Sequence, residues 1–167
     1  MTQRSAVHAT FVIERSFEAA PARVFNAFAD ETAKSKWFSG PDEWEKGPRE
    51  FDFRVGGRET SNGGPKGGPM SSFLCLYQDI VPNERIVYTY DMSLDGRRIS
   101  VSLATIEFKS KGTGTQFKLT EQGVYLDGYD DAGSREHGTR WLFGKLAESL
   151  GEKPDPATTL DWKPPAR

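Results

Sequence analysis

The sequence SREHGTRWLFGKLAESLGEK, residues 134–153, decides the fold, because the preceding chain is rich in strand patterns that need something to wrap around. Its large apolar residues recur at helical spacing and form one stripe along about four turns of helix. The members of this stripe are Leu142, Phe143, Leu146, Ala147 and Leu150. We therefore expect a long amphipathic helix whose stripe is buried.

The two halves of this predicted helix differ. Ser134 is a candidate N-cap, and Gly151 is typical of a helix end. The leucines all lie in the C-terminal half, which is expected to pack. The N-terminal half carries polar and small residues before Trp141, namely Arg135, His137, Gly138 and Thr139. Because glycine costs ~1 kcal/mol relative to alanine inside a helix, Gly138 needs a reason. Either a neighbouring ring occupies its space, or this half borders a cavity, which is our hypothesis.

The chain begins with a strand pattern and two helix patterns. Residues 11–17, FVIERSF, alternate in polarity and predict a half-buried strand. Pro21 suits the first turn of a helix, and the apolar residues after it share one helical face. A second short helix is expected at about residues 31–37, with Trp37 and Phe38 as an aromatic anchor at its end.

The central part of the chain alternates in the manner of strands. The predicted strands cover residues 51–55, 71–80, 86–92, 98–109 and 116–122. In the fourth of these strands the apolar parity changes, which predicts a β-bulge near Ala104 or Thr105. Residues 124–133 are expected to connect the last strand to the final helix.

The segment SNGGPKGGP, residues 61–69, is too rich in glycine and proline to be predicted as regular structure. It lacks the GxxxxGK[ST] spacing and the following helix of a phosphate-binding loop. We therefore interpret it as a mobile hairpin loop, with a lid over a cavity mouth as one role for it.

Together these elements predict an α+β fold. A curved antiparallel β-sheet wraps around the long C-terminal helix, and two short helices follow the first strand. A length of 167 residues suits one domain, which we place at residues 1–153. Residues 154–167, with four prolines, are expected to form an extended or disordered C-terminal tail.

Composition argues against several classes of function. A formal net charge of −2 gives no field that attracts nucleic acid. No window approaches the ~20 apolar residues of a membrane span. Cys75 and two histidines cannot build a usual structural zinc site, although a carboxylate-built metal site stays open. We expect a soluble cytoplasmic protein without a metal or other cofactor, in which Cys75 is an inert buried thiol.

Five segments carry a family resemblance. They are IERSFEAAPARVFNAFADETAKSKWF (13–38), FDFRVGGRE (51–59), YQDIVPNERIVYTY (77–90), GTGTQFKLTEQG (112–123) and the terminal helix. Over about residues 9–152 the chain resembles the Hsp90-ATPase-activator-like family of the START and Bet v 1 helix-grip superfamily (SRPBCC). The resemblance implies a cavity between the sheet and the C-terminal helix. The superfamily includes lipid and hormone carriers, polyketide aromatases and cyclases, and the co-chaperone that gives the family its name.

Three polar side chains are candidates for catalysis, and none is assigned a catalytic role. Arg15 and Glu121 continue otherwise apolar strand faces, so each needs a partner or water. They either enter a solvated cavity and orient a polar ligand group or lie on the solvated rim. His137 has an unperturbed pKa that suits acid and base chemistry at neutral pH, and packing on the helix surface is its alternative.

The candidate ligand-binding residues are mainly aromatic, because ligand pockets are lined by apolar and aromatic side chains with few polar groups. They are Trp37, Phe53, Tyr77, Tyr88, Tyr90, Gly138 and Trp141. The tyrosines add hydroxyl groups that can fix a polar group of a ligand. Ordinary core packing is the alternative for each of these residues.

Three functions follow. The first is a non-catalytic protein that binds a small, largely apolar or amphipathic ligand in the cavity. The second is an enzyme of the aromatase or cyclase type that uses the same cavity, with His137, Glu121 or Arg15 managing protons. The third is a module that interacts with a chaperone, heat-shock protein 90. A homodimer is compatible with all three.

Overall fold

Eight antiparallel strands form one sheet in the computed structural model, which describes residues 3–154. The strands are β1 (Ala6–Phe17), β2 (Glu45–Lys46), β3 (Glu50–Phe51), β4 (Arg58–Gly64), β5 (Ser71–Val81), β6 (Arg85–Leu94), β7 (Arg97–Lys111) and β8 (Gly114–Leu126). The helices are α1 (Pro21–Ala29), α2 (Glu31–Ser35) and α3 (Ala132–Ser149). The strand order is β1-β8-β7-β6-β5-β4-β2, and β3 also pairs with β4.

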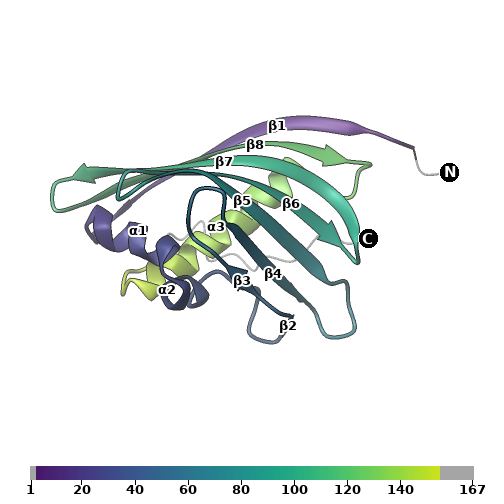
Figure 1. Ribbon diagram of the computed structural model, residues 1–167, viewed down its shortest axis with the longest axis horizontal. Helices are drawn as coiled ribbons and strands as arrows, with labels where there is room; N and C mark the ends of the chain where they lie inside the picture. Colours follow the sequence, from purple (N-terminus) through teal and green to yellow (C-terminus); the bar gives the residue numbers. More distant parts are fainter. Residues whose placement is uncertain (1–2, 155–167) are drawn as a thin grey trace.

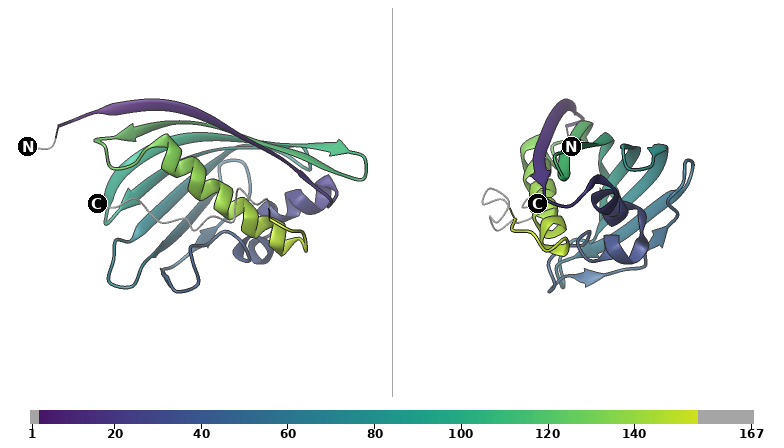
Figure 2. Two further views of the ribbon diagram at one scale, coloured as in Figure 1. Left: turned by 180° about the vertical axis from the view of Figure 1, so that it is seen from behind. Right: turned by 90° about the vertical axis from the view of Figure 1, so that its left-hand side faces the viewer.

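The sheet is strongly curved, and all three helices lie on its concave side. α3 runs diagonally across the concave face, and α1 and α2 lie at one end of it (Figure 1). Both views in Figure 2 show the strands bending around these helices. The predicted α+β helix-grip fold is therefore confirmed. None of the helices in residues 3–154 is long and apolar enough to cross a membrane.

Phenylalanine rings fill the end of the concave face near α1. Phe117 is fully buried at its centre. Its ring centroid lies 5.0–5.9 Å from those of Phe17, Phe28, Phe108 and Phe143. The C-terminal half of α3 adds Leu146 and Ala147, which are also fully buried. Since each large apolar side chain contributes ~1.5–3 kcal/mol on burial, this end carries much of the stability of the fold.

The start of α3 differs from the prediction, and its end agrees. Asp131, and not Ser134, is the N-cap. The Asp131 carboxylate accepts hydrogen bonds from the Ser134 backbone N–H at 2.9 Å and from the Ser134 hydroxyl at 3.1 Å. A carboxylate also interacts favourably with the positive end of the helix dipole, so the helix begins earlier. The end at Gly151 is confirmed, because Gly151 has a φ of 78°.

The described chain ends at residue 154, so the predicted tail, apart from Pro154, lies outside the described residues. Just before this point, the carboxylate of Glu152 accepts hydrogen bonds from two backbone N–H groups. The donors are Glu18 at 2.7 Å and Ala19 at 3.2 Å. These contacts tie the end of α3 to the segment between β1 and α1.

Several strand boundaries differ from the sequence prediction. β1 begins at Ala6 and is longer than residues 11–17, and β8 continues to Leu126 through part of the predicted connection. In contrast, the predicted strand at 51–55 is short, because the chain turns after β3. Gly57 N–H donates to the Arg54 carbonyl at 2.8 Å, which closes that turn.

The glycine-rich segment at 61–69 is not irregular throughout, so that prediction was wrong for its first part. Residues 61–64 belong to β4, which pairs with β5 on one side and with β2 on the other. A Cβ atom at Gly64 would collide with the carbonyl oxygen of Pro69, so glycine permits the tight turn that follows. The mobility of this turn stays a prediction.

The β-bulge in β7 lies at Ile99, and not near Ala104 or Thr105 as predicted. The register with β6 shifts there, whereas the pairing of β7 with β8 continues without a shift from residue 100 to residue 111. The parity change in the sequence has another origin. Val101 and Leu103 are aliphatic residues on the outer face, where they are 37% and 36% exposed.

Candidate functional site

A cavity of about 290 Å³ lies between the concave face of the sheet and the N-terminal half of α3. Ligand pockets usually enclose ~300–1,000 Å³, so this cavity suits a small molecule. Its walls come from α1, from α2 and the following segment, from β2, from β4 to β8 and from α3. They include Trp37, Phe38, Phe73, Tyr88, Tyr90, Gly138, Trp141 and Leu142.

Small side chains face inward on β7 and β8 in the part of the sheet away from the phenylalanine rings. Ser102 pairs with Gly123, and Ala104 lies one inward-facing position further along β7. At the other end of the same two strands, Phe108 pairs with Phe117. Inward positions on these two strands thus change from phenylalanine to serine, alanine and glycine, but none of these three small residues lines the cavity, and the Ser102 hydroxyl already lies against Gly123.

The sequence of α3 matches this change. Arg135, Gly138 and Thr139 face the cavity, whereas Leu146 and Ala147 are buried in the core. The predicted difference between the two halves of the helix is therefore confirmed. Gly138 lines the cavity without a side chain, and projection of a larger side chain into the open volume stays a prediction.

A polar cluster, which we call the Arg135 cluster, forms one wall of the cavity. Arg135 Nη1 donates to the Tyr90 hydroxyl at 3.0 Å, and Nη2 donates to Ser100 Oγ at 2.7 Å and Asp130 Oδ2 at 2.8 Å. The Tyr90 hydroxyl in turn donates to Glu121 Oε2 at 2.8 Å. The Arg135 guanidinium therefore binds the Asp130 carboxylate directly and is linked to the Glu121 carboxylate through the Tyr90 hydroxyl.

Glu121 is the titratable member of this cluster. Its side chain is buried, with 2% of the residue exposed. Burial raises the pKa of Glu121 to about 6, although the charge of Arg135 and the hydrogen bond from Tyr90 oppose this change. Glu121 can therefore exchange a proton near neutral pH.

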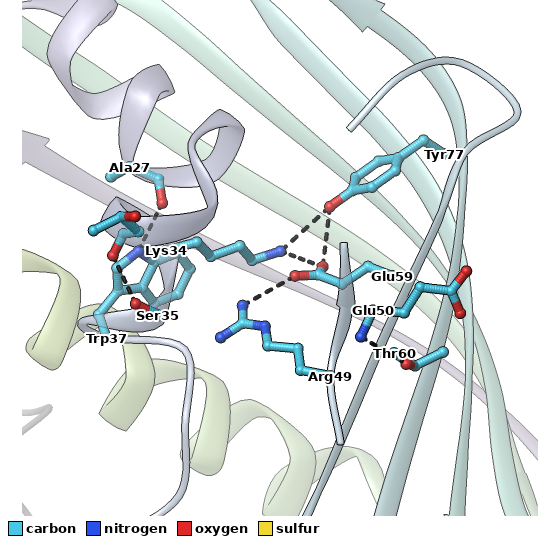
Figure 3. Close-up of polar contacts among 10 residues, drawn as sticks. Ala27, Lys34, Ser35, Trp37, Arg49, Glu50, Glu59, Thr60 and Tyr77 are labelled. Atoms are coloured by element: carbon cyan, nitrogen blue, oxygen red, sulfur yellow. Dashed lines mark hydrogen bonds and ion pairs between the residues drawn. The ribbon is translucent and has the colours of Figure 1, made fainter. Parts of the chain in front are cut away.

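A second polar cluster, the Glu59 cluster, lies on the side of α2 and β4 (Figure 3). Glu59 is completely buried, and its Oε2 atom accepts hydrogen bonds from Lys34 Nζ at 2.5 Å and from the Tyr77 hydroxyl at 3.0 Å. Its Oε1 atom accepts one from Arg49 Nη2 at 3.2 Å. The Lys34 ammonium also lies 4.5 Å from the centroid of the Phe38 ring. Lys34, Arg49 and Phe38 line the cavity.

The two clusters are separated by one strand. Glu59 pairs with Cys75 of β5, which pairs with Tyr90 of β6, so about 10 Å separates the backbones of Glu59 and Tyr90. Burial raises the pKa of the Cys75 thiol to about 12, so a thiolate nucleophile is not formed at neutral pH. Within residues 3–154, no group of three or more His, Cys, Asp or Glu side chains could hold a metal ion.

The structure places most of the sequence candidates on the cavity wall. Those that line it are Trp37, Tyr88, Tyr90, Glu121, Gly138 and Trp141. Tyr77 instead belongs to the Glu59 cluster, and Phe53 packs against it, with ring centroids 4.9 Å apart. Tyr77 contributes through its hydrogen bond to Glu59, and a ligand contact of Phe53 or Tyr77 stays a prediction.

The three polar candidates are not brought together. Glu121 enters the cavity wall, whereas Arg15 lies between β1 and α3, where Nη1 donates to the Phe143 carbonyl at 3.3 Å. His137 is half-buried on α3 but is not among the cavity-lining residues of the described chain. The arrangement therefore orients polar groups of a bound molecule and offers one titratable carboxyl, Glu121.

Sequence reasoning missed Lys34, Arg49 and Glu59, and it gave Arg135 no role in a site. Glu59 lies in the segment RETSNGG, which has no apolar face against which an inward charge would stand out. One signal did exist for Lys34. It precedes Phe38 of the aromatic anchor by four residues, so the two side chains share a helical face.

Residues 18–151 match the family described as Activator of Hsp90 ATPase homolog 1-like protein. The chain belongs to this family. The resemblance read from the sequence is thereby confirmed, and it places the protein in the wider helix-grip superfamily. Among curated proteins, no sequence matches the chain.

Several solved structures of bacterial proteins share the fold. A Rhizobium loti protein is 44% identical, with a TM-score of 0.82, over 87% of this chain and 99% of its own. An uncharacterised Rhizobium leguminosarum protein is also 44% identical, with a TM-score of 0.85, over 90% and 99%. An AHSA1-like protein from Aeromonas hydrophila is 16% identical over 86% and 92%, and its TM-score of 0.65 supports the fold alone.

Proposed function

We propose that the protein binds a small, largely apolar molecule in the cavity between the sheet and α3. The observation that carries this proposal is the hollow of about 290 Å³ beside Gly138, in a sheet whose other end is filled by packed phenylalanine rings. The hollow is partly open to solvent and its walls are mainly apolar, which is the setting in which proteins bind small molecules.

The chemistry of the walls supports an apolar body for this ligand. Aromatic rings dominate, and Phe73, Tyr88 and Tyr90 form a continuous surface on β5 and β6, with ring centroids 5.0 Å and 5.9 Å apart. Burial of the ligand against them contributes about 25 cal/mol per Å² of apolar surface. The buried carboxylates of the walls and their partners occur in two separate clusters, and polar groups placed in this way can orient a ligand.

Native mass spectrometry of protein purified without detergent tests the proposal first, because a bound ligand adds a reproducible mass. Uptake of N-phenyl-1-naphthylamine, a neutral dye whose fluorescence rises in apolar surroundings, is the second test. Gly138→Leu should block uptake by filling the cavity. Glu148→Leu, which adds the same side chain at an exposed position of α3, is the matched control. Equal uptake by wild type and Gly138→Leu would argue against the cavity as the binding site.

A second candidate is proton-transfer catalysis of the aromatase or cyclase type in the same cavity. Glu121 favours it, because a buried carboxyl with a pKa of about 6 can act as acid or base near neutral pH. Glu121→Gln keeps the shape and removes the proton exchange. Loss of turnover with retained ligand uptake in this variant would support an enzyme, whereas unchanged turnover would exclude Glu121 as its acid or base.

A chaperone partner is a third candidate, which the description of the family supports. Stoichiometric co-purification of heat-shock protein 90 would favour it. We place all three activities in the cytoplasm, and Cys75, a buried free thiol, is consistent with a reducing compartment.

A further inference from the structure

We infer that the ligand carries an acidic group and that Lys34 and Arg49 bind it at the α2 side of the cavity. This inference rests on the proposed function, since it specifies the class of molecule that enters the same cavity. The class is an organic acid with an apolar body, aliphatic or aromatic.

The first argument is the charge of the Glu59 cluster. Lys34 and Arg49 are both paired with Glu59, which has one negative charge for the two positive ones. Lys34 is 5% exposed and Glu59 is 0% exposed, so water screens this imbalance poorly. An anion in the cavity would complete the pairing.

Neighbouring charges do not remove the imbalance. Glu45 and Lys46 also line the cavity, and they contribute one charge of each sign. Glu50 is exposed, and Figure 3 shows its carboxylate pointing away from Arg49. The wall between α2 and β4 therefore keeps an excess positive charge.

The second argument is an unused donor. Arg49 Nη2 donates to Glu59, but Arg49 Nε is buried and has no hydrogen-bond partner within residues 3–154. A buried donor without an acceptor lowers stability, and guanidinium groups bind carboxylates in a planar, often bidentate geometry. A ligand carboxylate beside Arg49 would supply the missing acceptor.

The third argument is the contrast with the Arg135 cluster. There Arg135 faces two carboxylates, Asp130 directly and Glu121 through Tyr90, and its Nη2 atom donates to the protein oxygens of Ser100 and Asp130. A second anion would be repelled by these carboxylates. The two sides of the cavity therefore differ in charge, and an acid would bind with its carboxylate toward Lys34 and Arg49.

A matched pair of probes tests this inference. N-phenyl-1-naphthylamine is neutral, and 8-anilinonaphthalene-1-sulfonate has the same aromatic body with an anionic group. Wild type should bind the anionic probe more tightly, and Arg49→Gln should weaken that binding about tenfold while changing the neutral probe less than about twofold, because one charge-assisted hydrogen-bond partner is lost. Arg49→Lys should keep part of the preference. Arg54→Gln, which removes an arginine that is 69% exposed, is the control.

Competition measurements on wild type keep the inference testable if Arg49→Gln does not fold. Decanoate and 1-naphthoate should each displace the neutral probe better than their methyl esters, and the better competitor identifies an aliphatic or an aromatic body. Equal displacement by acids and esters would overturn the inference, as would an equal loss of both probes in Arg49→Gln. In those cases a block of neutral-probe uptake by Gly138→Leu would leave the proposed function intact. Failure of both probes to bind wild type would overturn both proposals.

Discussion

Replacement of Gly138 by leucine separates a cavity from a packed interface at the N-terminal half of α3. Glycine is ~0.8–1 kcal/mol less favourable than alanine inside a helix, and leucine is close to alanine. The cavity of about 290 Å³ beside Gly138 is large compared with the ~30 Å³ that one water occupies, so we expect the four added carbons of leucine to enter it. We therefore expect Gly138→Leu to raise the unfolding free energy by roughly 0.5–1 kcal/mol.

A domain of this size should then gain roughly 2–4 °C in thermal midpoint per kcal/mol. Thermal unfolding followed by circular dichroism measures this change, and dye uptake is measured on the same samples. Gly138→Ala is the informative companion, because it gains helix propensity but leaves the cavity open to the dye. If Gly138→Leu instead lost ~1–3 kcal/mol, as an overpacked core does, the reasoning from the cavity would be refuted.

Three further changes test the polar groups. Glu59→Gln should lower the unfolding free energy by ~3 kcal/mol in urea titrations, because Lys34 and Arg49 lose their shared carboxylate, whereas exposed Glu14→Gln should change it little. The pKa of Glu121 rises from 4.5 to about 6 on folding, so between these pH values the folded state binds a proton that the unfolded state releases. The free energy of unfolding therefore falls by about 2 kcal/mol as pH rises from about 4.5 through 6. Relative to wild type, Glu121→Gln should therefore become more stable as pH rises, and a constant difference between pH 4.5 and 7 would contradict this. Ser102→Ala should be neutral or stabilising by up to ~1 kcal/mol in the same titrations, because the buried Ser102 hydroxyl has no hydrogen-bond partner in the described chain; a loss above ~1 kcal/mol would reveal one.

Local patterns in the sequence were sufficient for the helix-grip architecture. The stripe of Leu142, Leu146 and Leu150 and the alternating strands each follow from burial of one face, which periodicity reports directly. The bulge at Ile99 was misplaced, because the outer face of β7 carries aliphatic residues as well, and alternation alone does not tell the two faces apart. The glycines of β4 prevented its prediction as a strand, because β4 is stabilised by pairing on both edges and not by an alternating pattern of its own.

The polar clusters depend on distant parts of the chain. Lys34, Arg49 and Glu59 come from a helix, a connecting segment and a strand, so no spacing in the sequence brings them together. The inward position of Glu121 was visible as a charge on an apolar strand face. Its pairing with Tyr90 and Arg135 required the register of β6 to β8 and the direction of α3.

Cys75, the sole cysteine in the sequence, lies on β5 between the two clusters and is almost completely buried. Alkylating reagents reach such a thiol only when the sheet opens around it, so the labelling rate measures how often that opening occurs. A molecule that binds the closed state slows labelling in proportion to its occupancy. The labelling rate of Cys75 can therefore rank unlabelled compounds by how much they slow its alkylation, without any mutation or attached dye.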